Sequence, residues 1–178
     1  MVRDCSPRQT GRMSTLELLR PDHAEAVLAF ERANRAYFAR SIPDRGDAYF
    51  AEFAARHAAL LAEQAEGVCR FHVIRGADGG VVGRVNLIDL VDGSAELGYR
   101  IAESAAGRGL ARAAVAEVCR LAAAAYGLTA LTAATTVDNA ASRAVLAHNG
   151  FRFRHECRLG GRPGLAYRRD LTDLRPSA

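Results

Sequence analysis

The stretch of residues 94–112 places a strand pattern, a glycine-containing turn and the start of a helix in immediate succession. Alternation of apolar residues over 95–101 predicts the strand, and Gly107 and Gly109 predict a tight turn before an alanine-rich helix that begins near Leu110. Glycines leave backbone N–H groups accessible, and a helix N-terminus adds a partial positive charge. We therefore predict that this turn binds a phosphate or a diphosphate.

The residues around the turn narrow the choice of phosphate ligand. A P-loop requires Gly-Lys-Ser/Thr, and the chain contains no lysine at all. A dinucleotide-binding fingerprint requires a third glycine where Arg112 stands. The diphosphate of coenzyme A is the remaining fit.

Length and composition favour one compact domain. The chain has 178 residues, of which 49% are hydrophobic, enough for a single sizeable core. We expect residues 1–13 to be a disordered leader and residues 14–178 to form the domain. The net charge of +4 favours anionic ligands such as coenzyme A and does not favour nucleic acid.

Scattered cysteines and the absence of long apolar runs point to a cytoplasmic protein. Cys5, Cys69, Cys119 and Cys157 form neither a CxxC pair nor a disulfide framework, and the five histidines show no metal-ligand spacing. No segment approaches the ~20 apolar residues of a membrane span. We therefore expect no metal, no membrane partner and a reducing compartment.

Periodicity and turn signals predict an α/β domain with a mixed sheet. The helix patterns cover residues 24–40, with Asp22 as the N-cap, then 47–64, 110–126 and 139–148. The strand patterns cover residues 15–19, 68–74, 81–90, 95–101, 128–135, 151–157 and 165–170. Residues 71–101 read as an antiparallel meander, and the crossover through 110–126 makes its two strands parallel.

Two motifs resemble the GNAT N-acetyltransferase superfamily, and within it the RimJ/RimL branch of ribosomal-protein N-terminal alanine acetyltransferases. The first is Glu-Leu-Gly-Tyr-Arg-Ile followed by Gly-Arg-Gly-Leu-Ala, in which Gly109 and Ala111 match the family's loop pattern. Ala106 occupies the position at which Gln or Arg is usual, so one side-chain contact to phosphate is missing. The second is Asn-x-x-Ser followed by Gly-Phe, with Asn139 and Ser142 in register. The resemblance covers residues 14–170.

The resemblance implies the GNAT fold: a mostly antiparallel sheet of six to seven strands with about four helices on its two faces. It also implies acetyl-CoA as co-substrate. The predicted diphosphate contacts are Gly107, Arg108, Gly109, Leu110, Ala111 and Arg112. The predicted pantetheine contacts are the backbone of Leu97, Gly98, Tyr99, Arg100 and Ile101, together with Asn139. An ordinary, fully paired strand is the alternative for residues 97–101, and solvated surface arginines are the alternative for Arg108 and Arg112.

Two residues are candidates for proton transfer. Glu96 lies in the strand, and a carboxylate there can take a proton from an amine, directly or through water. By resemblance, the Ser142 hydroxyl protonates the departing thiolate, a role that a tyrosine has in many relatives. Structural alternatives stay open: Glu96 as a surface residue or an arginine partner, and Asn139 and Ser142 as first-turn helix residues.

Acceptor contacts are implied by resemblance at Asn34, Arg35, Tyr37 and Phe38, although core packing explains the two aromatic residues equally well. The amine attacks the thioester directly in a ternary complex. An α-amine with a pKa of about 8 loses its proton more easily than a lysine at about 10.4, which favours a protein N-terminus as acceptor. A small amine, such as an antibiotic, polyamine or amino-acid derivative, and a non-catalytic coenzyme A sensor are the alternatives. A homodimer is a further expectation.

An arginine-rich C-terminal hairpin is the remaining feature. Its arginines could contact an acidic substrate or the 3′-phosphate of coenzyme A, or could form a solvated edge of the sheet. They stand at positions 152, 154, 158, 162, 168 and 169.

Overall fold

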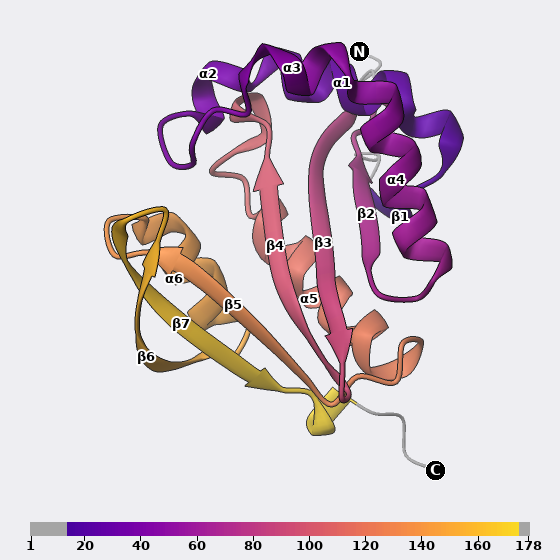
Figure 1. Cartoon of the computed structure of the whole chain (residues 1–178). Coiled ribbons are helices and arrows are strands. Elements are labelled where there is room, and N and C mark those ends of the chain that lie inside the picture. The colour runs from indigo at the N-terminus through magenta and orange to yellow at the C-terminus, as the bar shows by residue number, and fades with distance from the viewer. Residues whose placement is uncertain (1–13, 175–178) are drawn as a thin grey trace, which may run out of the picture.

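A seven-stranded mixed sheet organises the chain in the computed structural model, which describes residues 14–174 (Figure 1). The strands are β1 (Thr15–Leu18), β2 (Arg70–Arg75), β3 (Val81–Val91), β4 (Ser94–Ile101), β5 (Ala130–Thr136), β6 (Arg152–Leu159) and β7 (Arg162–Asp170). The helices are α1 (Ala24–Ala33), α2 (Arg35–Phe38), α3 (Gly46–Ala51), α4 (Phe53–Ala65), α5 (Leu110–Ala124) and α6 (Ala140–His148). The predicted leader, residues 1–13, lies outside the described residues.

The strand order is β1-β2-β3-β4-β5-β7-β6, and β4 with β5 is the one parallel pair in the described sheet. The prediction of a mixed, mostly antiparallel sheet is therefore confirmed. The antiparallel meander is confirmed too, and its Asp92-Gly93 turn has positive φ at both residues, 49° and 72°. This is the backbone geometry that a two-residue hairpin needs and that Asp-Gly favours.

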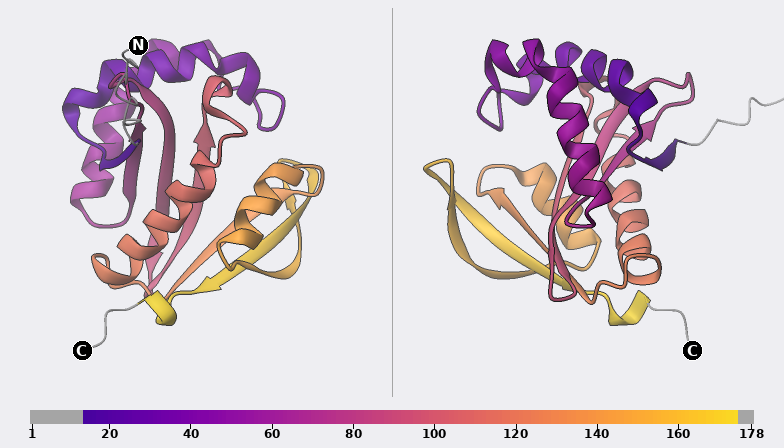
Figure 2. Two further views of the ribbon diagram at one scale, coloured as in Figure 1. Left: turned by 180° about the vertical axis from the view of Figure 1, so that it is seen from behind. Right: turned by 45° about the vertical axis from the view of Figure 1, so that its right-hand side comes forward.

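Helices cover both faces of the sheet. On one face α5 and α6 pack on a core that includes Val85, Leu97, Val115 and Leu131 (Figure 2). On the other face the N-terminal helices α1, α3 and α4 cover a second core, which includes Phe53 and Val73. The sheet thus separates two layers of helices, and a cavity that passes between its strands is bordered by both layers.

Six helices stand where four were predicted, because two predicted helices are each interrupted. The helix predicted over residues 24–40 breaks at Asn34, whose Nδ2 donates to the Phe30 carbonyl and whose Oδ1 accepts from the backbone N–H of Glu103. The helix predicted over residues 47–64 breaks at Glu52. Both breaks let the chain bend over the top of the sheet, as Figure 1 shows.

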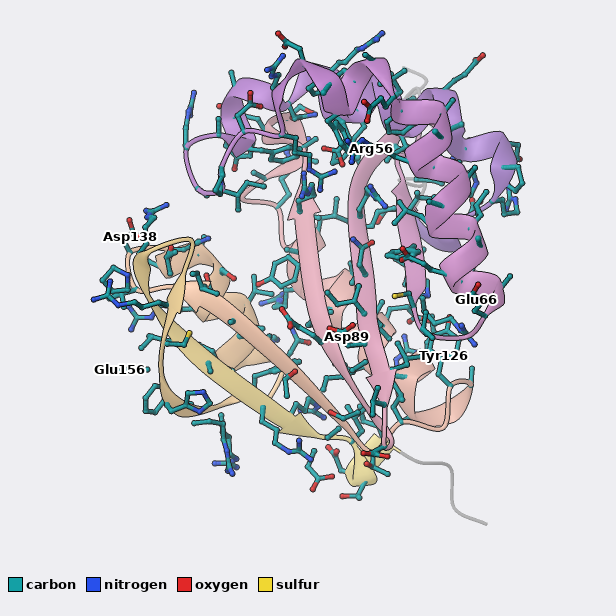
Figure 3. The ribbon with its side chains drawn as sticks, in the orientation of Figure 1. Arg56, Glu66, Asp89, Tyr126, Asp138 and Glu156 are labelled. Atoms are coloured by element: carbon teal, nitrogen blue, oxygen red, sulfur yellow. The ribbon has the colours of Figure 1, made fainter. Side chains whose placement is uncertain are left out.

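Two smaller predictions were wrong. Asp22 does not cap α1; it lies in a 3₁₀ turn over Pro21–His23, and its carboxylate binds the Arg20 guanidinium instead. The last strand begins at Arg162 and not at residue 165, because Gly160 and Gly161 with positive φ suffice for the hairpin turn. In Figure 3 this hairpin, with Glu156 on β6, forms the wing opposite α4.

Candidate functional site

The two wings of the sheet separate between β4 and β5. The pairing of β4 with β5 joins Ser94 to Ala130, Ala95 to Leu131 and Glu96 to Thr132 and then stops. Beyond this point β4 continues to pair with β3 as far as Ile101. Figure 1 shows the two strands meeting at one end and diverging toward the other. Residues 97–101 of β4 therefore have one backbone edge without a strand partner, available to a ligand.

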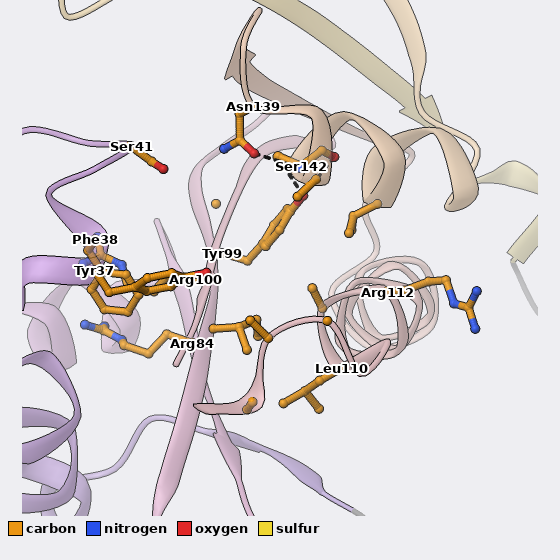
Figure 4. Close-up of a pocket in the computed structure, with 18 of the residues that line it drawn as sticks. Tyr37, Phe38, Ser41, Arg84, Tyr99, Arg100, Leu110, Arg112, Asn139 and Ser142 are labelled. Atoms are coloured by element: carbon orange, nitrogen blue, oxygen red, sulfur yellow. Dashed lines mark hydrogen bonds between the residues drawn. The ribbon is translucent and has the colours of Figure 1, made fainter. Parts of the chain in front are cut away.

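A cavity of about 590 Å³ lies at this divergence (Figure 4). Thirteen of its lining residues were predicted as site residues: Tyr37, Phe38, Gly98, Tyr99, Arg100, Ile101, Gly107, Gly109, Leu110, Ala111, Arg112, Asn139 and Ser142. Eight were not predicted: Ser41, Ile42, Arg84, Asn86, Ala105, Ala106, Ala141 and Val145. The predicted residues Asn34, Arg35, Glu96, Leu97 and Arg108 are not among the lining residues.

The glycine turn forms one end of the cavity. Gly107 and Gly109 have φ of +74° and +77°, and Gly109 directly precedes α5, which begins at Leu110. A side chain other than glycine is strained in this conformation. The first N–H groups of a helix have no acceptor within it, so the turn presents donors and the positive end of the α5 dipole to the cavity. The residues fit a diphosphate through their backbone.

The two arginines of the turn contribute less. Arg108 is exposed and does not line the cavity, and in Figure 4 the Arg112 guanidinium points away from it. Ala106 lines the cavity without a polar side chain. An anion bound here would be held by the main chain, which requires the glycines but places little demand on the side chains.

Tyr99 and Ser142 meet above the middle of the cavity. The Tyr99 hydroxyl lies 2.9 Å from Ser142 Oγ, and Asn139 Oδ1 accepts from the Ser142 backbone N–H at 3.0 Å. Asn139 is thus the N-cap of α6, as its position predicts, and it fixes the turn that holds Ser142. Burial raises the pKa of Tyr99, and the contact with Ser142 opposes this shift in part. The phenol is therefore neutral, and a proton donor, near pH 7.

Glu96 lies on the face of β4 that α1 covers, and it is exposed. Strand alternation puts Glu96, Gly98 and Arg100 on one face of β4 and Leu97 and Tyr99 on the α5 face. Water therefore has access to the Glu96 carboxylate, and Glu96 lies two residues from Gly98, which lines the cavity. Leu97, 3% exposed, is a core residue.

The part of the cavity next to α1 has a wall of charged residues that was not predicted from the sequence. Arg84 on β3 pairs across the strands with Arg100 on β4, and Asn86 with Gly98, so all four share one face. Both arginines contact Glu31 of α1, which is 2% exposed. The sequence contained one signal for this wall: Arg84 is a charged residue in an otherwise apolar segment, next to Val82, Gly83 and Val85.

The four predicted acceptor residues fall into two groups. Tyr37 and Phe38 line the cavity, and the Arg100 guanidinium lies 5.1 Å from the Phe38 ring centre. Asn34 is buried, with both ends of its amide bonded to backbone groups. Arg35 pairs with Asp44 and Asp47, and these contacts raise the pKa of its guanidinium. Asn34 and Arg35 therefore shape the α1–α2 bend.

Arg162 closes one side of the cavity mouth. Its guanidinium donates to the Ser41 carbonyl at 3.1 Å and to Asp138 Oδ2 at 2.6 Å. It therefore connects the loop after α2 with the loop before α6, across the gap between the wings. Of the six hairpin arginines, this one is next to the cavity, because Ser41 lines it.

The described part of the chain shows neither a metal-binding cluster nor a membrane-spanning helix. Among residues 14–174, no group of three or more His, Cys, Asp or Glu side chains is arranged to hold a metal ion. Within the same range, no helix combines the length and the apolar character that crossing a bilayer requires.

Comparisons with known proteins agree with this geometry. The family model for the acetyltransferase (GNAT) domain matches residues 14–152. No protein matches in the comparison with curated sequences. The solved structure of Mycobacterium smegmatis RimJ in complex with CoA-disulfide is similar over 92% of this chain and 85% of that chain, with 28% identity and a TM-score of 0.81.

Two more distant structures share the fold. Ribosomal-protein-S5-alanine acetyltransferase from Vibrio fischeri is 20% identical, with a TM-score of 0.83 over 92% of this chain and 96% of that one. Spermidine N-acetyltransferase from Vibrio cholerae, solved with CoA and spermine, is 17% identical, with a TM-score of 0.73 over 90% of this chain and 97% of that one. The similar structures thus include both protein and polyamine acetyltransferases.

Proposed function

Because the chain belongs to the GNAT acetyltransferase family, and is therefore an acyltransferase that uses acetyl-CoA, we propose that it acetylates the α-amine of a protein N-terminus. The observation that carries the acetyl-CoA part of the proposal is that the strand edge left open where β4–β5 pairing ends at Glu96 and the Gly107–Gly109 turn border one cavity, and the likeness to RimJ supports the acceptor. A ligand with a diphosphate and an amide-bearing arm fits this combination, because the turn donates to phosphate and the open strand edge pairs with amides.

Acetyl-CoA, when bound, supplies a thioester carbonyl that an amine can attack. The residues of the chain then position the two reactants. The backbone of Gly107 to Ala111 holds the diphosphate, and the free edge of residues 97–101 aligns the arm so that the thioester lies near Gly98 and Tyr99. A backbone N–H of this edge stabilises the negative charge that develops on the carbonyl oxygen.

The transfer requires two proton movements. The amine must be neutral to attack, and after the C–N bond forms it releases a second proton while the C–S bond breaks. The first proton of the amine goes to solvent before the attack. Once the C–N bond has formed, Glu96, on the acceptor face, takes the second proton, directly or through water. Ser142, held by Tyr99 and by the Asn139 cap, gives its proton to the departing thiolate and takes one from the Tyr99 phenol. Water carries the proton from Glu96 to the Tyr99 phenolate, so both groups return to their starting states.

An α-amine suits this arrangement better than a lysine side chain. At neutral pH a lysine pays about 4 kcal/mol to lose its proton, against roughly 1 kcal/mol for an α-amine. One exposed carboxylate is a modest base, so an acceptor that is already partly neutral is favoured. The 28% identity to RimJ over 92% of this chain supports the same choice.

A thiol-release assay with acetyl-CoA tests the proposal. The panel contains peptides that begin with Ala or Ser, the same peptides with a blocked α-amine, a lysine-bearing peptide with a blocked N-terminus, and spermidine. We expect release with the unblocked peptides alone. Release with spermidine or other small amines alone would favour the small-molecule alternative, and no release with any amine, despite coenzyme A binding, would favour a sensor.

Three accompanying expectations stay predictions. They are a cytoplasmic location, a homodimer and a single domain over residues 14–178. Size-exclusion chromatography with light scattering measures the second directly.

A further inference from the structure

The acceptor side of the cavity carries more positive than negative charge. Glu31 faces three guanidinium groups: Arg100 at 2.9 Å, Arg84 at 3.4 Å and Arg45 at 4.0 Å. Glu31 and Arg84 are 2% and 4% exposed, so neither charge is screened by bulk water. One carboxylate balances one of these cations, and the cluster keeps an excess of two positive charges.

The buried hydrogen-bonding groups of this wall are not all satisfied. Within residues 14–174, the Nε of Arg84 and the Oδ1 of Asn86 are buried and have no hydrogen-bond partner. Both residues line the cavity. A buried donor on a charged group and a buried amide acceptor each cost free energy while unpaired; both atoms are covered in this structure, so a ligand pairs with them only when the side chains turn toward the cavity.

The spacing of these groups describes a ligand. Arg84 and Asn86 are two residues apart on the same face of β3, roughly 7 Å along the strand. Asn86 lies opposite Gly98, beside the proposed position of the thioester, and its Oδ1 can accept from an amine. Arg84 lies opposite Arg100, farther from the thioester, and the two guanidinium groups can donate to an anion.

The anion is not a phosphate of coenzyme A. Arg84, Arg100 and Asn86 share the face that carries α1, whereas the anion-binding turn leads into α5 on the opposite face. In Figure 4, Arg84 and Arg100 lie on the Tyr37 and Phe38 side of the cavity, across from Leu110 and Arg112. The cluster therefore faces the acceptor.

Resting on the proposed function, we propose that Arg84 and Arg100 form an anion subsite that selects N-termini with an acidic residue at the second position. In an extended peptide, the second side chain places its carboxylate about two strand residues from the α-amine, which matches the spacing between Asn86 and Arg84. Glu31 positions the two guanidinium groups. Burial lowers the pKa of Arg100, Glu31 opposes this shift, and Arg45 and Arg84 add to it, so an incoming carboxylate would stabilise the charged guanidinium.

The test compares peptides that differ only at the second residue: Ala-Asp, Ala-Asn and Ala-Lys, each followed by the same neutral sequence. The measurement is kcat/KM from thiol release at constant acetyl-CoA. We expect the Asp peptide to exceed the Asn peptide by about 10- to 100-fold, the worth of a charge-assisted pair, and the Lys peptide to be slowest. The preference should shrink as salt rises.

Two variants assign the preference to the subsite. Arg100→Gln should reduce the Asp-to-Asn ratio to near 1, whatever its rate with the Asn peptide, because the ratio within one variant cancels any general loss of activity. Arg45→Gln is the matched control: it removes one cation from the same carboxylate but does not line the cavity, so the ratio should persist. Circular dichroism and a thermal melt check that each variant is folded.

The outcomes distinguish a failure of the proposed subsite from a failure of the proposed function. If the Asp and Asn peptides are acetylated equally by the wild-type protein, the subsite is wrong and the N-terminal activity stands. If no peptide is acetylated, the proposed function fails. If Arg45→Gln lowers the Asp-to-Asn ratio as much as Arg100→Gln does, the preference comes from the overall positive charge of the region and not from a specific subsite. Because the wild-type ratio is measured first, misfolding of Arg100→Gln cannot hide the result.

Discussion

The hydroxyl of Tyr99 on β4 lies 2.9 Å from the Oγ of Ser142 on α6, and this contact joins the two wings of the sheet across the cavity. The same hydroxyl lies 3.3 Å from the Ser142 carbonyl. The phenol has one proton, which it donates either to the Ser142 carbonyl or to Ser142 Oγ; in the second arrangement the serine proton is available to a sulfur atom in the cavity. The pair thus has a structural and a chemical role that mutation can separate.

Tyr99→Phe and Ser142→Ala should each lower kcat by about 10²-fold, because each interrupts proton delivery to the thiolate. The double variant should be no slower than the slower single variant, since both changes remove one pathway. Steady-state thiol release measures all four proteins. Multiplied losses in the double variant would mean that the two hydroxyls act independently.

Gly109→Asp should weaken coenzyme A binding at least tenfold by placing a negative charge at the diphosphate position. Gly109→Asn is the matched control, because Asn has the same shape, tolerates positive φ and carries no charge. Isothermal titration with coenzyme A gives both affinities. Equal affinities for the Asp and Asn variants would place the diphosphate elsewhere.

Glu96→Gln should lower kcat by 10²-fold or more and leave coenzyme A affinity and thermal stability unchanged, because the side chain is exposed and off the coenzyme A face. Glu156→Gln, an exposed carboxylate on β6, is the control and should behave as wild type. A Glu96→Gln enzyme with full turnover would assign deprotonation of the amine to water.

His72 should make the protein less stable in acid. Its Nδ1 donates to the Val85 carbonyl, so Nε2 accepts from the Tyr126 hydroxyl at 2.8 Å, and the ring is neutral (Figure 3 labels Tyr126). Burial, the largest cause, and the charge of Arg70 lower the pKa of His72 to about 4, while the bond to Val85 opposes them.

The direction in which stability changes with pH follows from the protonation of His72 in the folded and unfolded chain. Between pH 6.5 and about 4, the unfolded chain binds a proton at His72 that the folded chain does not, so the free energy of unfolding falls as pH falls. The loss is about 3 kcal/mol over this window. Urea denaturation at pH 7 and pH 4.5 should show it, and His72→Gln should reduce the difference. The exposed His148→Gln should keep it.

Local sequence determined the elements whose causes are local. Asp92-Gly93 specified a hairpin, Gly107 and Gly109 specified the turn before α5, and Asn139 capped α6, because each residue's own backbone preference or side chain decides the geometry. The strands and the start of α5 followed from apolar periodicity. Together with the second motif, these features were sufficient to predict the fold class and the use of acetyl-CoA, while the roles of the individual site residues stay predictions.

Tertiary structure decided what depends on partners far apart in the chain. The break at Asn34 exists because its amide reaches the backbone of Glu103, 69 residues away, where periodicity predicts one continuous helix. In the sequence, Arg84 is a single charged residue within an apolar strand pattern. In the fold, Glu31, 53 residues earlier, lies beside it in the core. Charges attract through space without regard to sequence order, so the acceptor wall became visible only once α1 was packed on β3 and β4.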